Sequence, residues 1–196
     1  NLASFNITKY LVEGENLIAV EVYRNSDASF LESQDMFRLP GIFRTVSLTS
    51  RNPIELRDIR VRTDLDAQYK DAVANIEVDV RNLTKKAAKN YKVKVQLYKN
   101  ELYSDNNEIL EGAAAVNAVS QIANGETTTV NIPLAVANPA KWSAEEPNRY
   151  TLVVSLLDKK GRTVEMASTY MGFREVEIRE TKAEDDELEK QDSSNG

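Results

Sequence analysis

An alternation of apolar and polar residues with a period of two constrains the fold of this chain more than any other feature. It is regular from position 54 onwards, in residues 54–61, 76–81, 91–97, 129–134 and 150–156. Successive side chains of a β-strand point to opposite faces, so this pattern predicts strands with one buried and one solvated face. Residues 158–161, Asp-Lys-Lys-Gly, predict a hairpin turn into a further strand over 163–170. About seven such strands favour an all-β, immunoglobulin-like antiparallel sandwich.

The first 52 residues follow a different pattern. Residues 17–23 and 43–48 predict two strands, separated by a long excursion that begins at Arg24. Arg51-Asn52-Pro53 then interrupts the chain, because proline cannot donate to a strand ladder. A set of two or three strands is marginal on its own in water. We therefore expect residues 1–52 to be part of a larger domain, and the chain to be an all-β fragment of a larger protein.

The sequence has neither cysteine nor histidine. Disulfides, thiolate zinc sites and catalysis by a cysteine or histidine are therefore excluded for this chain. No apolar run reaches the length of about 18 residues that a membrane helix needs, and no basic stripe suggests nucleic-acid binding. We expect neither a membrane nor a nucleic acid as a partner.

Two segments lack a clear pattern. Residues 179–196 hold seven acidic and three basic residues, so they carry −4 of the net charge of −6. A segment this charged buries too little apolar surface to offset its ordering entropy, and it is predicted to be an acidic linker. Residues 112–123 are rich in alanine and predict either a loop or a weak edge strand.

Three segments interrupt the alternation with large or charged residues. The first, beginning at Arg24, contains Gln34-Asp35-Met36-Phe37-Arg38. The second, residues 138–150, contains Trp142 between two prolines, and the third is residues 172–176, Gly-Phe-Arg-Glu-Val. Together with the opening residues 5–11 and 14–20, they make the chain resemble the long bacterial β-galactosidases of glycoside hydrolase family 2 from Leu2 to Ile178. Three separated motifs in the right order are more specific than one short pattern.

This resemblance implies a domain order. Residues 1–52 would be the C-terminal part of a jelly-roll sugar-binding domain, and residues 53–178 the immunoglobulin-like domain. Residues 179–196 would lead to a TIM barrel that carries both catalytic glutamates and is absent from this chain. The parent protein would hydrolyse terminal β-D-galactosides with retention, whereas the fragment alone is expected to be inactive and to hold no catalytic residue. The resemblance leaves the bacterial cytoplasm and the periplasm open, and implies a homo-oligomeric parent.

The resemblance also implies one binding residue. In the family, the aspartate at the position of Asp35 reaches the active site in the barrel, where it contacts the galactosyl group and a sodium ion. A carboxylate accepts hydrogen bonds from sugar hydroxyls and is a hard ligand for a cation. We expect no cofactor in the fragment, and sodium with magnesium as a second ion in the parent enzyme. A structural reading of Asp35 is an ion pair with Arg38 or Arg44.

Trp142 has two interpretations. It is either a platform that stacks on a sugar or packing that closes one end of the sandwich, and we prefer the second. Asp64-Leu65-Asp66 lacks the glycine and spacing of a calcium loop, so it is interpreted as part of a turn.

The chain as a whole has two readings besides a β-galactosidase fragment. It could be a stand-alone carbohydrate-binding or adhesion module, because a β-sandwich does not by itself decide function. It could also be a fragment of a family 2 β-glucuronidase or β-mannosidase.

Overall fold

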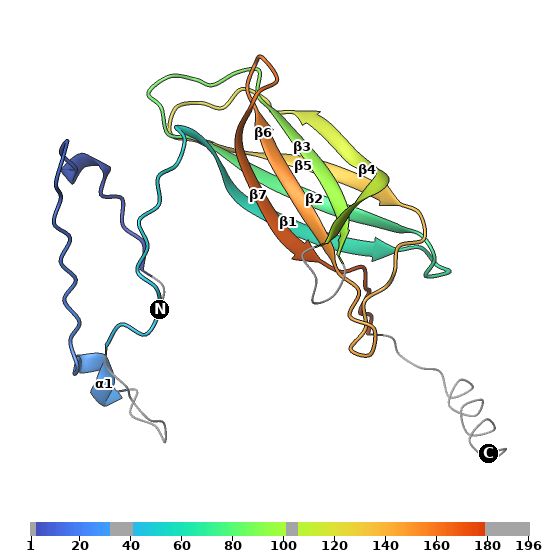
Figure 1. Ribbon diagram of the computed structural model, residues 1–196, viewed down its shortest axis with the longest axis horizontal. Coiled ribbons are helices and arrows are strands. Elements are labelled where there is room, and N and C mark those ends of the chain that lie inside the picture. The colour runs from blue at the N-terminus through green and yellow to red at the C-terminus, as the bar shows by residue number, and fades with distance from the viewer. Residues whose placement is uncertain (1–2, 32–40, 101–105, 179–196) are drawn as a thin grey trace. The chain divides into compact units, whose positions relative to one another are not determined.

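A computed structural model describes residues 3–31, 41–100 and 106–178 (Figure 1). The chain divides into two compact units, Asn1–Thr49 and Ser50–Gly196. No helix in these described ranges is long and apolar enough to cross a membrane.

The second unit is a sandwich of two antiparallel sheets (Figure 1). The three-stranded sheet has the order β1-β2-β5 and is formed by β1 (Ile54–Leu65), β2 (Ala72–Asn82) and β5 (Thr127–Val136). The four-stranded sheet has the order β4-β3-β6-β7 and is formed by β3 (Lys92–Asn100), β4 (Asn107–Ala118), β6 (Tyr150–Leu157) and β7 (Thr163–Met171). The prediction of an all-β antiparallel sandwich is confirmed, including the hairpin between β6 and β7.

The alternating residues form the core between the sheets. Val93, Val95 and Leu97 of β3 are fully buried, as are their counterparts on β6, in which Val154 pairs with Val95. Val78 of β2 is fully buried on the other sheet. Complete burial of a side chain of this size contributes roughly 1.5–3 kcal/mol. This repeated apolar face supplies the main driving force for folding of the sandwich.

The alanine-rich segment is an edge strand. β4 lies at the end of the four-stranded sheet, next to β3, so the second of the two predictions for this segment is confirmed. The β3–β4 register shifts between Gln96 and Tyr98. At this irregularity the Gln96 side-chain amide donates to the carbonyls of Leu110 and Ala113, both at 3.2 Å. A side chain thus satisfies backbone groups at the point where the ladder is interrupted.

Two polar side chains anchor the loops. Asn82 is fully buried, and its amide nitrogen lies 2.7 Å from the carbonyl of Lys86 and 3.1 Å from that of Ile122. It therefore joins the loop after β2 to the loop before β5. Asp66 accepts backbone hydrogen bonds from Lys70 at 2.7 Å and Asp71 at 3.1 Å, which confirms it as a turn residue. These hydrogen bonds hold the pKa of Asp66 below its usual value. The turn prediction is wrong for Asp64 and Leu65, which pair with β2 as the last residues of β1.

The strands predicted in the first unit are not observed. Among its described residues the regular elements are a 3-10 helix at Thr8–Tyr10 and a short α-helix, α1 (Asp27–Leu31), and residues 17–23 and 43–48 form no strand. Leu17 is 96% exposed and Phe43 is 81% exposed. A strand needs a hydrogen-bonded neighbour as well as an apolar pattern. Neither segment has such a neighbour in the described part of the chain, so these two predictions are wrong for this structure.

Candidate functional site

Asp35, the predicted substrate and sodium ligand, lies outside the described residues. The same holds for all of Gln34-Asp35-Met36-Phe37-Arg38. Its contacts with a galactosyl group and a cation therefore stay a prediction. Arg44, one of the two residues considered as an ion-pair partner, is described and is exposed to solvent.

The other two motif segments meet at one end of the sandwich. Lys141 and Phe173 form a parallel β-bridge. The backbone N–H of Trp142 donates to the carbonyl of Phe173 at 2.9 Å. A second bridge joins Trp142 to Pro147 and closes the loop that precedes β6. Segments 138–150 and 172–176 thus form one structural unit, although they are far apart in the sequence.

Phe173 is the buried centre of this unit. Its side chain is fully buried, and its ring meets that of Tyr150 edge to face, with the centroids 5.1 Å apart and the planes at 81°. Such pairs stabilise by about 0.5–1.5 kcal/mol beyond the area that they bury. The Tyr150 hydroxyl accepts a hydrogen bond from the backbone N–H of Ala140 at 2.8 Å. Two aromatic side chains therefore close this end of the sandwich.

Trp142 belongs to the same unit and is partly buried. A Cβ atom built at Gly172 would lie 2.9 Å from the Trp142 Cβ, so only glycine leaves room for the indole here. The guanidinium carbon of Arg174 lies 5.0 Å from the centroid of the Trp142 ring, within the range of a cation–π interaction. This arrangement supports the packing interpretation of Trp142 over the sugar platform.

The residues that follow β7 are held against β1. The Thr63 hydroxyl donates to the carbonyl of Arg174 at 3.0 Å, and the Leu65 N–H donates to the Glu175 carboxyl at 3.1 Å. A hydrogen bond with Glu177 raises the pKa of Glu175. The side chains of Thr63 on β1 and Glu175 after β7 thus help to fix the direction in which the chain leaves the sandwich.

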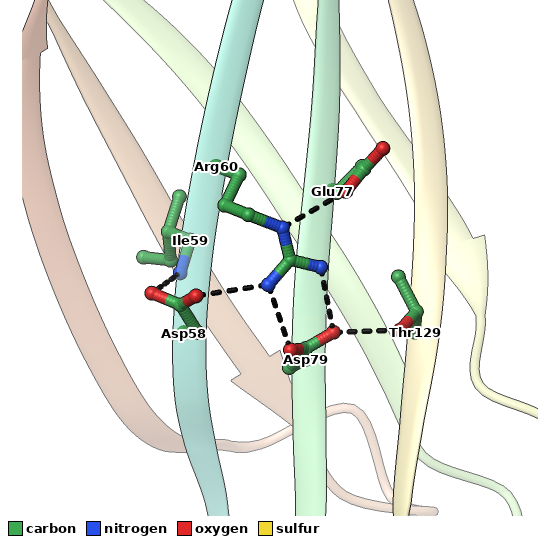
Figure 2. Close-up of polar contacts among 6 residues, drawn as sticks. All are labelled: Asp58, Ile59, Arg60, Glu77, Asp79 and Thr129. Carbon is green, nitrogen blue, oxygen red and sulfur yellow. Dashed lines mark hydrogen bonds and ion pairs between the residues drawn. The ribbon is translucent and has the colours of Figure 1, made fainter.

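A second polar cluster, shown in Figure 2, lies on the outer face of the three-stranded sheet. Arg60 donates to Glu77 at 2.9 Å, to Asp58 at 2.8 Å and to both carboxyl oxygens of Asp79 at 2.8 and 3.1 Å. Thr129 donates to Asp79 at 2.6 Å. The hydrogen bonds from Arg60 lower the pKa of Asp79, and its three acidic partners raise the pKa of Arg60. Arg60 is hydrogen-bonded to all three carboxylates, so we assign the cluster a structural role.

A third cluster surrounds the buried carboxylate of Glu55, which is 1% exposed. Arg81 donates to it through Nε at 2.8 Å and also through Nη2. Arg51 lies 3.9 Å from Glu55 and 3.5 Å from Glu165, and Glu165 also accepts from the Leu56 N–H at 2.7 Å. This network joins the segment before β1 to β2 and β7. Each carboxylate is engaged by arginine or backbone, as in a structural ion-pair network rather than an acid–base pair.

Within residues 3–31, 41–100 and 106–178, no group of three or more acidic side chains is arranged to hold a metal ion. Each of the clusters described above is held together by packing and hydrogen bonds among its own residues. In the described part of the chain, the geometry favours a structural domain that fixes the paths of the chain into and out of the sandwich.

Comparisons with known proteins assign the family. Residues 54–174 match the family model described as glycosyl hydrolases family 2, and residues 1–53 match its sugar binding domain. A curated β-galactosidase from Priestia megaterium is 41% identical over 177 residues, which cover 90% of this chain and 16% of the relative. A β-galactosidase from Pseudoalteromonas haloplanktis is 37% identical over 183 residues, with the same two coverages. The chain thus spans about a sixth of the length of these relatives.

A solved structure gives independent support for the fold. A glycosyl hydrolase family 2 member from Bacteroides cellulosilyticus superposes with a TM-score of 0.53 at 22% identity, covering 63% of this chain and 16% of that one. At this identity the likeness concerns the fold alone. The family assignment rests on the match that spans most of the sandwich, and by this match the chain belongs to glycosyl hydrolase family 2.

Proposed function

We propose that this chain is a non-catalytic part of a β-galactosidase that hydrolyses terminal β-D-galactosides with retention. The observation that carries the proposal is the 41% identity to a curated β-galactosidase over 90% of the chain. The two catalytic glutamates would belong to a TIM barrel outside this sequence. Residues 1–52 would form part of the jelly-roll sugar-binding domain, and residues 179–196 would lead towards the barrel.

In this proposal the sandwich is a rigid spacer. The contacts of Thr63 with Arg174 and of Leu65 with Glu175 support this role, because they hold the exit of the chain in one direction. The network around Glu55 holds the segment by which the chain enters the sandwich. A spacer fixed at both ends would allow a residue of the preceding domain to reach an active site in the following one.

Asp35 is the residue to which we assign that contact. Its carboxylate would accept hydrogen bonds from the galactosyl hydroxyls and supply one oxygen ligand to a sodium ion. One carboxylate is too few ligands for a cation site, so the remaining ligands would come from the barrel, and magnesium would be a second ion of the parent enzyme. We further propose that the parent enzyme is a homo-oligomer.

Two assays test the proposal. The 196-residue chain is expected to give no turnover of o-nitrophenyl β-D-galactopyranoside above the blank, and any turnover would contradict its non-catalytic role. The longer protein that contains this sequence is expected to hydrolyse the galactoside with retention, read from the anomer first released by NMR. It should act more slowly on the matching β-glucuronide and β-mannoside. A preference for either of these substrates would overturn the galactosidase assignment within the same family.

A further inference from the structure

The outer face of the four-stranded sheet carries a groove that the role of spacer does not use. Its volume is about 530 Å³, and its lining includes Tyr98, Asn107, Thr151, Val153, Ser168 and Tyr170. These residues come from β3, β4, β6 and β7. None of the lining residues that the structure describes carries a formal charge at neutral pH.

A second groove, of about 590 Å³, lies between β1 and β7. Its lining includes Val61, Met171 and Arg174, so it lies beside the exit of the chain. It is part of the structural unit that holds that exit, and its walls are accounted for by the contacts of Thr63 and Glu175. The groove on the outer face of the four-stranded sheet has no such structural explanation.

The register of the strands places two tyrosines on either side of this outer groove. Tyr98 of β3 pairs with Thr151 of β6, and Thr151 pairs with Tyr170 of β7. Their neighbours Leu97, Leu152 and Met171 are buried, so the three paired residues face outward. Adjacent strands lie about 4.8 Å apart, which separates the backbones of the two tyrosines by about 10 Å.

This spacing suits one saturated ring. An aromatic ring stacks at about 4 Å from an apolar surface, so two tyrosines whose backbones lie about 10 Å apart can flank a single pyranose. Val153 and Ser168 pair with each other and extend the floor between the walls. A pyranose presents C–H groups on its faces and hydroxyls at its edges, and the groove offers matching apolar walls and a polar floor.

The Thr151 hydroxyl of the floor and the Tyr170 ring of one wall both have fixed neighbours. The Thr151 hydroxyl donates to the Asn100 side-chain carbonyl at 2.6 Å, and it also lies 3.2 Å from the Asn107 Oδ1. The guanidinium carbon of Arg149 lies 4.8 Å from the centroid of the Tyr170 ring, and Tyr170 remains 64% exposed. Hydroxyl and ring orientations fixed before binding reduce the entropy that a ligand must overcome.

We propose that this groove binds a neutral saccharide, with one pyranose ring between Tyr98 and Tyr170 and its hydroxyls in contact with Thr151 and Ser168. None of the described lining residues supplies a counter-charge for a phosphorylated or carboxylated ligand, and the neighbouring Arg149 guanidinium is already placed against the Tyr170 ring. This site lies within the sandwich and is separate from the contact assigned to Asp35.

Titration by two-dimensional NMR of the 196-residue chain tests the proposal, with methyl β-D-galactopyranoside and methyl β-D-glucopyranoside as probes. Glycerol serves as a control that has hydroxyls but no ring. The expected result is saturable shifts at the amides of Thr151, Val153 and Ser168 with at least one glycoside, at a Kd on the order of 1–100 mM. Glycerol should leave these amides unshifted. No saturable shift in this groove with either glycoside would overturn the proposal.

Substitutions of Tyr170 test whether its ring forms one wall of the groove. Tyr170→Ala is expected to weaken binding at least about fivefold, whereas Tyr170→Phe should retain affinity within about twofold because it keeps the stacking face. Met166→Ala is the matched control, since Met166 lies on the same strand and is 66% exposed but does not line the groove. The amide spectrum of each variant shows whether it is folded. Equal affinity in wild type and Tyr170→Ala would contradict the site. The titration measures binding and not turnover, so its outcome is independent of the proposed galactosidase activity.

Discussion

Gly172 and Trp142 lie so close together that a Cβ atom at position 172 would be 2.9 Å from the Trp142 Cβ and 3.1 Å from its Cγ. The contact joins the residue that follows β7 to the loop that precedes β6. It is a close link between the two motif segments at this end of the sandwich. Since the chain leaves the sandwich immediately afterwards, the contact bears directly on the direction of its exit.

Gly172→Ala is therefore expected to destabilise the sandwich by about 1–3 kcal/mol, the cost of overpacking a closely packed site. Urea unfolding followed by the fluorescence of Trp142, the single tryptophan of the chain, measures the change. The double variant Trp142→Ala/Gly172→Ala, compared with Trp142→Ala by circular dichroism, is the control. Adding Gly172→Ala should cost much less once the indole is gone, and an undiminished cost would show that the indole contact is not its origin.

Phe173→Ala is expected to cost about 3–5 kcal/mol, because it leaves a cavity in the fully buried centre of the same unit. Phe173→Leu should cost less, since it keeps most of the buried volume. Phe5→Ala is the matched control: Phe5 is 82% exposed, and its loss should change the free energy of unfolding by less than about 0.5 kcal/mol. Urea unfolding compares the three. Equal effects of Phe173→Ala and Phe5→Ala would disprove the assigned role of Phe173.

Arg81→Met is expected to cost roughly 3 kcal/mol, because it leaves the buried carboxylate of Glu55 without its closest cation. The penalty comes from an uncompensated charge rather than from the loss of a favourable contact. Glu55→Gln/Arg81→Met should therefore be more stable than Arg81→Met alone. Thermal unfolding at neutral pH compares the stability of the two variants. A double variant that is no more stable than the single one would show that the charge of Glu55 is not the cause.

Asp79 is expected to account for part of the acid sensitivity of the sandwich. Hydrogen bonds from Arg60 hold the pKa of Asp79 below its usual value, and Thr129 and Arg57 act in the same direction. A carboxyl whose pKa is lower in the folded than in the unfolded state adds stability above the unfolded value of about 3.9, and loses it as the pH falls through the folded value. Wild type should thus exceed Asp79→Asn in stability at neutral pH.

The difference between wild type and Asp79→Asn should be constant above about pH 5 and should shrink below about pH 4. Measuring the free energy of unfolding of both proteins between about pH 7 and pH 3 checks this. Asp158, whose pKa is likewise lowered by hydrogen bonds from Arg162, serves as the comparison through Asp158→Asn. A difference that does not change with pH would contradict the ion-pair explanation.

The sequence predicted correctly those features of the fold that follow from the residue pattern within a single strand. The period-two alternation around Val78, Val95 and Val154 predicted the buried face of each sheet, and these residues are fully buried. The three motifs around Asp35, Trp142 and Phe173 together predicted the family, which the comparisons confirm. Both inferences depend on the order of residues along the chain and not on which strands pair.

Features that depend on pairing between strands could not be predicted. Arg60 and Glu77 are separated by 17 positions, and only the β1–β2 register brings them together. Tyr98 and Tyr170 lie on strands that do not neighbour each other, so their groove requires the strand order β3-β6-β7. The same limit explains the two strands that were wrongly predicted before position 50: their apolar pattern was present, but a pairing partner in the described residues was not.

Asp35 offers the most direct test of whether this chain belongs to a β-galactosidase whose active site receives a residue from the preceding domain. The measurement is kcat/KM for a chromogenic β-galactoside, with sodium varied, in the longer protein and its Asp35→Ala variant. Asp27→Ala is the control, because Asp27 lies on α1 in the same excursion. We predict that Asp35→Ala lowers kcat/KM on the order of 100-fold and weakens the response to sodium, while Asp27→Ala changes neither. Wild-type activity and an unchanged sodium response in Asp35→Ala would contradict this role.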